Sequence, residues 1–337
     1  MKGDKMKKKL LSMILVVTMG MVTACGSSQT AAPGASGEPA EETSGETSGT
    51  EAGDMVYKIG YTVFDTADEY TGYRADVFKE TCEATGSMTV NVTNADNDQQ
   101  KQIDQVDNFI NQGCDAVVIT AVDQDGAVPA VEACNNAGIP CFVIGASVNG
   151  GEYYHISSET YEGGYVTFEY LCEVLPENAK ICYMQGALGF SDVTERQQAR
   201  DDAIKKYDRG DIQILAEQTG NWVAEEAMTL TEDWLSAYSD VDAIVCQNDA
   251  MALGTIEALK VANKLDDVIV TGVDGTNAGL EAVKAGEMLC TGMQDALGQS
   301  NAFIDVFHEL QSGAVPEKVT MIPFTLVTSE NVDEYLQ

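Results

Sequence analysis

From Met55 onward, short apolar runs rich in β-branched residues alternate with longer segments in which apolar residues recur every three or four positions. The short runs predict strands, and the longer segments, such as 99–111, predict helices. Regular alternation of the two is typical of α/β proteins in which helices cover both faces of a parallel sheet. The predicted strands form two series, at 56–63, 88–92, 116–120, 141–144 and 154–157, and then at 180–184, 212–217, 243–246, 268–272 and 289–293. Two similar series predict two similar lobes.

The N-terminus has the pattern of an export signal. Five lysines between positions 2 and 9 precede an apolar run at 10–22, which is shorter than the stretch of about 20 residues that spans a membrane. Small residues follow, and the segment 21–25 resembles a bacterial lipobox, with Met21 at the position where Leu is commoner. We therefore predict a lipoprotein signal peptide at 1–24 and a lipidated Cys25. An ordinary signal peptide with an incidental cysteine is the alternative.

Residues 25–54 are mainly Gly, Ser, Thr, Ala, Pro and Glu, a composition that buries too little apolar surface to offset its ordering entropy. We predict that this segment is a flexible linker. The whole chain has 54 acidic and 19 basic residues, a net charge of −35, and removal of five Lys and one Asp with residues 1–24 leaves 53 against 14, or −39. Such a charge repels nucleic-acid phosphates and anionic lipid headgroups. Nucleic-acid binding is thereby excluded, and contact with the membrane is expected only through the lipid.

Cysteine and histidine usage leaves little material for metal or cofactor chemistry. Only His155 and His308 are available as imidazole ligands or bases. No cysteine belongs to a CxxC pair, and most lie inside apolar runs, where Cys behaves as a small core residue. We predict free, buried thiols at Cys82, Cys114, Cys134, Cys141, Cys172, Cys182, Cys246 and Cys290. Neither a metal nor a cofactor is expected.

The loops after the predicted strands hold the candidate chemistry, because ligands of open parallel sheets bind beyond the carboxyl ends of the strands. These loops are rich in carboxylates, amides and aromatic rings, at 65–70, 185–196, 221–222, 247–249, 274–275 and 294–295. Planar acceptors that bind adjacent hydroxyls, together with flat apolar faces, suit a sugar. A plainer interpretation is that Asp and Asn cap the following helices, and we prefer it for Asp249. For Trp222 the alternative is core packing.

Three segments carry a resemblance to a known family, namely 97–102 (NDQQKQ), 247–254 (QNDAMALG) and 272–276 (GVDGT). With them, the region from Met55 to Leu336 resembles the periplasmic sugar-binding proteins of bacterial ABC transporters, closest to the glucose/galactose-binding and ribose-binding proteins. The resemblance implies two Rossmann-like lobes of parallel sheet flanked by helices and joined by a three-strand hinge. It places the N-terminal lobe at 55–158 plus 295–322 and the C-terminal lobe at 159–294 plus 323–337.

Carried over position by position, the resemblance also implies a ligand site. It assigns ligand binding to Asp68, Tyr70, Phe190, Asp192, Arg196, Trp222, Asn248, Asp274 and Gln294. Two positions depart from the glucose/galactose-binding protein, because Gly145 stands in place of Asn and Phe190 in place of His, so two polar contacts are missing. The calcium loop of that family has no counterpart, and the run at 94–98 lacks the Gly and Glu that an EF-hand needs, so we interpret it as a solvated loop.

The function that follows is a lipid-tethered, monomeric receptor that closes around a monosaccharide and delivers it to an ABC permease. A receptor that presents a sugar or similar signal to a chemoreceptor or sensor kinase needs the same fold, so it remains the alternative. An enzyme is disfavoured, because a glycosidase needs two facing carboxylates, whereas Asp192 and Asp274 lie on separate loops. Arg196 is also close enough in sequence to hold Asp192 ionised.

Overall fold

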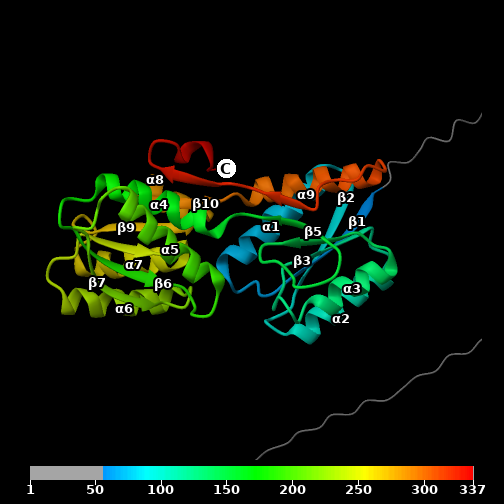
Figure 1. Cartoon of the computed structure of the whole chain (residues 1–337), viewed down its shortest axis with the longest axis horizontal. Coiled ribbons are helices and arrows are strands. Elements are labelled where there is room, and N and C mark those ends of the chain that lie inside the picture. The colour runs from blue at the N-terminus through cyan, green and yellow to red at the C-terminus, as the bar shows by residue number, and fades with distance from the viewer. Residues whose placement is uncertain (1–55, 337) are drawn as a thin grey trace, which may run out of the picture. The chain divides into compact units, whose positions relative to one another are not determined.

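The computed structural model describes residues 56–336, and it confirms the predicted α/β class: two sheets of six strands lie between layers of helices (Figure 1). All strands of the first sheet are parallel, in the order β11-β5-β4-β3-β1-β2. They are β1 (Tyr57–Val63), β2 (Met88–Asn94), β3 (Ala116–Ile119), β4 (Cys141–Ile144), β5 (Tyr154–Ser157) and β11 (Val319–Met321). We call this sheet and its helices the N-terminal lobe.

The second sheet repeats this order as β12-β10-β9-β8-β6-β7, with only the edge strand β12 antiparallel to its neighbour. Its strands are β6 (Lys180–Gln185), β7 (Gln213–Thr219), β8 (Ala243–Cys246), β9 (Ile269–Asp274), β10 (Cys290–Gln294) and β12 (Phe324–Thr328). In both sheets the strand order reverses beside the first strand of the series. This reversal, between β1 and β3 and between β6 and β8, is where doubly wound folds bind ligands.

Helices cover both faces of each sheet. The N-terminal lobe has α1 (Glu69–Ala84), α2 (Gln99–Asn111), α3 (Val128–Ala137) and α9 (Ala296–Gln311). The C-terminal lobe has α4 (Thr160–Val174), α5 (Ser191–Lys206), α6 (Ala224–Ala237), α7 (Asp249–Ala262), α8 (Asn277–Lys284) and the short 3-10 helix η1 (Val332–Glu334). Each lobe therefore has two hydrophobic clusters, one on each side of its sheet. None of the helices between residues 56 and 336 has the length and apolar character needed to cross a membrane.

The core confirms what the apolar runs predict. The central strands β3, β4 and β8 are buried at every position, as expected when helices cover both faces of a parallel sheet. All eight cysteines of the described chain are free and buried. The edge strands β11 and β12 are the two that the sequence pattern did not predict. Val319 and Met321 of β11 are exposed, so this edge strand is not one of the fully buried runs that the pattern identifies.

The chain passes between the two sheets three times. It leaves the first sheet after β5 and enters α4, returns between β10 and α9, and crosses again between β11 and β12. Only Ser158–Glu159, Asp295 and Ile322–Pro323 separate the elements at these points. The lobe boundaries at 158, 294 and 322 stay a prediction at the level of single residues. The signal peptide, Cys25 and the linker lie outside the described residues.

Candidate functional site

All nine residues that the sequence assigns to ligand binding line one cavity of about 610 Å³. They come from both lobes, and most follow the carboxyl ends of strands. The set is Asp68, Tyr70, Phe190, Asp192, Arg196, Trp222, Asn248, Asp274 and Gln294. The volume is within the range of about 300–1,000 Å³ that is usual for small-molecule pockets. Their individual roles toward a ligand stay a prediction.

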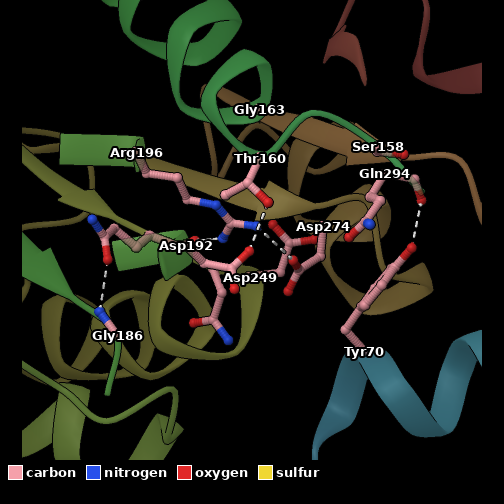
Figure 2. A network of polar contacts seen from close by, with 12 residues as sticks. Tyr70, Ser158, Thr160, Gly163, Gly186, Asp192, Arg196, Asp249, Asp274 and Gln294 are labelled. Atoms are coloured by element: carbon pink, nitrogen blue, oxygen red, sulfur yellow. Dashed lines mark hydrogen bonds and ion pairs between the residues drawn. The ribbon is translucent and has the colours of Figure 1, made fainter. Parts of the chain in front are cut away.

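Asp68 and Tyr70 bring the start of α1 to the N-terminal wall of the cavity. Asp68 is the N-cap of α1, where its Oδ1 accepts a hydrogen bond from the Thr71 N–H at 2.8 Å. The Tyr70 hydroxyl donates to the backbone carbonyl of Gln294 at 3.0 Å, a contact between the lobes that Figure 2 shows. One face of the Tyr70 ring lies under the guanidinium of Arg74, 5.3 Å from the ring centroid. Because Arg74 occupies that face, a ligand would have to stack on the opposite face of the Tyr70 ring.

The C-terminal wall is organised around the buried guanidinium of Arg196. Its Nη2 lies 4.0 Å from Oδ1 of Asp274 (Figure 2). Its Nη1 donates to the backbone carbonyl of Gln247, and its Cζ lies 5.6 Å from the ring centroid of Trp222. Each wall of the cavity thus pairs an arginine with an aromatic ring, an arrangement stabilised by the attraction of a cation to the ring face.

The expected pairing of Arg196 with Asp192 is wrong. Asp192 lies in the first turn of α5, and its Oδ1 accepts a hydrogen bond from the Thr160 hydroxyl at 2.7 Å (Figure 2). The ion pair of Arg196 goes instead to Asp274, which ends the neighbouring strand β9. Closeness along α5 did not decide the partner, because the guanidinium extends toward the strand ends.

The expected capping role of Asp249 is also wrong, because the cap of α7 is one residue earlier. The Asn248 side chain is the N-cap and accepts from the Met251 N–H at 3.0 Å. Asp249 is fully buried, and its carboxylate accepts hydrogen bonds from the Thr291 hydroxyl at 2.7 Å and the Thr276 N–H at 2.9 Å. This carboxylate therefore links the start of α7, which follows β8, to the loop after β9 and to the start of β10, and so supports the loop that carries Asp274.

Trp222 combines the two interpretations that the sequence left open. Its ring packs against the C-terminal core and also lines the cavity. It covers Gly186, where a Cβ atom would lie only 2.0 Å from the ring, and its own backbone has a positive φ of 67°. Phe190 precedes α5 at the rim and is 54% exposed. Gln294 ends β10 beside Asp274, since Met293 pairs with Asp274 across the two strands.

Acidic groups dominate the electrostatics of the cavity. Burial raises the pKa of Asp274 well above its usual range; Arg196 opposes the shift, and the charges of Asp249 and Asp68 add to it. Burial, together with Asp192, also raises the pKa of Glu195. Crowded, desolvated carboxylates need hydrogen-bond donors and repel anions. The cavity therefore suits a ligand rich in hydroxyl groups and disfavours a phosphate or a carboxylate.

Sequence reasoning missed several polar residues that line this cavity, among them Arg74, His155 and Glu195. Arg74 is in the second turn of α1, and His155 is on β5, where its Nε2 lies 2.7 Å from the carbonyl of Gly145. Neither residue follows the carboxyl end of a strand, so the search of strand-end loops that identified the other site residues did not include them. Glu195 shares the loop and helix of Asp192, and its spacing of three residues from Asp192 was the available signal. Within residues 56–336, no group of His, Cys, Asp and Glu has the arrangement of a metal site.

The comparison with known families agrees with this geometry. The family described as "Periplasmic binding protein domain" matches residues 59–314. The chain belongs to this family. Members of the periplasmic binding protein family act outside the cytoplasm, so the chain is an extracytoplasmic protein. The family match confirms the resemblance on which the site was predicted.

Relatives of this periplasmic binding protein are binding proteins and not enzymes, as predicted. A xylitol-binding protein of Mycolicibacterium smegmatis is 30% identical over 286 residues, 84% of this chain and 80% of that protein. The ribose import binding protein of Bacillus subtilis is 27% identical and covers 96% of this chain and 100% of its own. An ABC transporter solute-binding protein of Bacillus halodurans, solved with bound myo-inositol, is 34% identical with a TM-score of 0.72, covering 84% and 98% of the two chains.

Proposed function

We propose that this protein captures one neutral monosaccharide or polyol between its lobes and delivers it to the permease of an ABC importer. The observation that carries the proposal is a cavity lined by residues of both lobes. Carboxylates and amides there accept and donate hydrogen bonds, and the rings of Tyr70 and Trp222 supply apolar surface. Closure of the lobes around a ligand would exclude water and strengthen each of these contacts.

The relatives support a small, uncharged ligand with many hydroxyl groups. Their names and structures concern xylitol, ribose and myo-inositol. These compounds share closely spaced hydroxyls, although ribose and myo-inositol form rings and xylitol is an open chain. The carboxylates of the cavity match that common feature, since a desolvated carboxylate is a strong acceptor for hydroxyl donors.

We also propose that a lipid on Cys25 tethers the receptor to the cell membrane and that it acts as a monomer. The lipobox-like segment at 21–25 and the polar stretch up to residue 54 support the tether. A linker of that composition keeps the anchor and the receptor mechanically independent. The lobes would then capture ligand close to the extracytoplasmic face of the permease.

A thermal-shift panel tests the ligand class. Wild-type protein is melted with myo-inositol, xylitol, D-ribose, D-allose and D-galactose, and with glucose 6-phosphate as the anionic control. A ligand at about 100 times its Kd stabilises the folded state by about 2.7 kcal/mol, which corresponds to a Tm increase of roughly 5 to 10 °C. A shift with glucose 6-phosphate alone would contradict the proposal. Uptake of the radiolabelled compound in cells with and without the protein then separates transport from a sensory role.

A further inference from the structure

Arg74 is a buried arginine without an acidic partner. It is 4% exposed and lines the cavity, and its Nε is buried with no hydrogen-bond partner. Its Nη2 donates to the Thr120 hydroxyl at 3.2 Å, the hydroxyl of Tyr61 lies beside it, and the Tyr70 ring lies below it. All of these contacts are neutral. A buried charge with so few compensating groups is costly to the folded protein.

The other arginines show how this chain normally stabilises a guanidinium. The sequence has four, all within residues 56–336. Arg196 pairs with Asp274, Arg200 pairs with Glu217 at 2.7 Å, and Arg209 pairs with Asp211 at 3.0 Å. Among the ion pairs of the described chain, Arg74 alone of these arginines has none. No ion pair within the fold therefore accounts for the burial of Arg74.

Gly145 makes room for this side chain. It has a φ of +92°, a conformation that favours glycine, and a Cβ atom there would lie 3.2 Å from Nη1 of Arg74. Position 145 is also where the sequence lacks the polar side chain that the glucose/galactose-binding protein has. The guanidinium of Arg74, arriving from α1, occupies the space beside that backbone.

We propose that Arg74 is a ligand-binding residue that donates hydrogen bonds to an oxygen of the bound polyol and supplies the polar interaction that Gly145 has no side chain to make. This inference rests on the proposed function. A guanidinium has five N–H donors and no acceptor. The subsite beside it therefore takes a hydroxyl or ether oxygen and discriminates against a compound with hydrogen or an ammonium group at that position. The carboxylates on the opposite wall have the reverse preference, so together the two walls orient the ligand.

The test compares Arg74→Met with Arg200→Met. Arg200 is equally buried, at 4% exposure, but it has two acidic partners, lies 4.4 Å from the ring centroid of Tyr183, and does not line the cavity. In ligand-free protein, Arg74→Met should melt at or above the wild-type temperature, because it removes a buried charge that has no ion-pair partner. Arg200→Met should melt lower, because it leaves Glu217 without its partner. If Arg74→Met lowers the melting temperature by at least half as much as Arg200→Met does, or fails to fold, then Arg74 has a structural role and the proposal is wrong.

Calorimetry supplies the second readout, with the panel compound that shifts wild-type melting most. Arg74→Met should weaken its binding at least tenfold, Arg74→Lys should also weaken it because the planar fork is absent, and Arg200→Met should leave it within about threefold. Unchanged affinity in a folded Arg74→Met would overturn the proposal. If no compound of the panel binds the wild type, the proposed ligand class fails, while the ligand-free melting temperatures still decide whether Arg74 has a structural role.

Discussion

Asp274 is the residue whose replacement tests the site most directly. It ends β9, is 5% exposed, and faces Arg196 across 4.0 Å. Its backbone has a φ of +135°, a strained conformation of the kind that collects at binding sites. Asp274→Asn keeps the size of the side chain and changes only the charge and one acceptor oxygen.

The substitution should have opposite effects on binding and on ligand-free stability. A hydrogen bond to a charged acceptor contributes about 1.5 to 3 kcal/mol, so binding should weaken by about 10- to 150-fold. Burial raises the pKa of Asp274, with Arg196 opposing and Asp249 adding. A carboxyl with a raised folded pKa favours folding most below its unfolded pKa, about 4, and loses that contribution as pH rises through the folded pKa. The ligand-free mutant should therefore gain stability over the wild type as pH increases from about 4 to 7.

Calorimetry with the tightest panel compound and its deoxy analogues measures the first effect, and melting curves across pH measure the second. Asp211→Asn is the matched control, because its carboxylate lies outside the cavity and hydrogen bonds from Arg209 and the Asn178 N–H lower its pKa to about 2. It should lose stability at pH 7 and bind normally. The deoxy analogue that lacks the contacted hydroxyl should lose little more in Asp274→Asn. Equal discrimination by mutant and wild type among all analogues would refute the assignment.

Three further substitutions test separate parts of the structure. Trp222→Ala should weaken binding by about 1 to 3 kcal/mol in calorimetry while circular dichroism still shows a folded protein; unchanged affinity would return Trp222 to a packing role. Cys25→Ser should leave binding intact and move the protein from the membrane fraction to the soluble fraction, and a mutant that still sediments with membranes would refute the lipid anchor. Asp249→Ala should lower stability by roughly 1 to 3 kcal/mol in denaturant titrations, because the Thr276 and Thr291 donors lose their acceptor; a midpoint equal to that of the wild type would contradict its role in linking α7 to these two residues.

The repeating strand and helix pattern predicted ten of the strands, because a strand covered on both faces has to be apolar throughout. It failed at β11, an edge strand whose Val319 and Met321 are exposed, and at β12, an antiparallel edge strand that is only partly buried. The pattern also could not predict which of two adjacent polar residues caps a helix. Both Asn248 and Asp249 are good capping residues, and only the turn of α7 shows that the first caps the helix and the second faces the interior.

The site was predictable where its residues follow strand ends, since topology alone brings those loops together. Arg74 was not, because an arginine inside an amphipathic helix normally extends to solvent, and nothing local indicates that this one is buried. The ion-pair partner of Arg196 also could not be predicted from the sequence. Asp192 and Asp274 are both acids on candidate loops, and only the direction of the Arg196 side chain selects between them.

The three crossings between the sheets also determine when each lobe is able to fold. The N-terminal core contains Phe303 and Phe307 from α9, and Phe303 lies 4.8 Å from Phe78 between ring centroids. The edge strands β11 and β12 come later still, at 319–321 and 324–328. Neither lobe has all of its parts until nearly the whole chain has been synthesised, and pairings this distant in sequence form slowly. For a protein that acts outside the cytoplasm, late completion delays the folding of both lobes until nearly the whole chain is available.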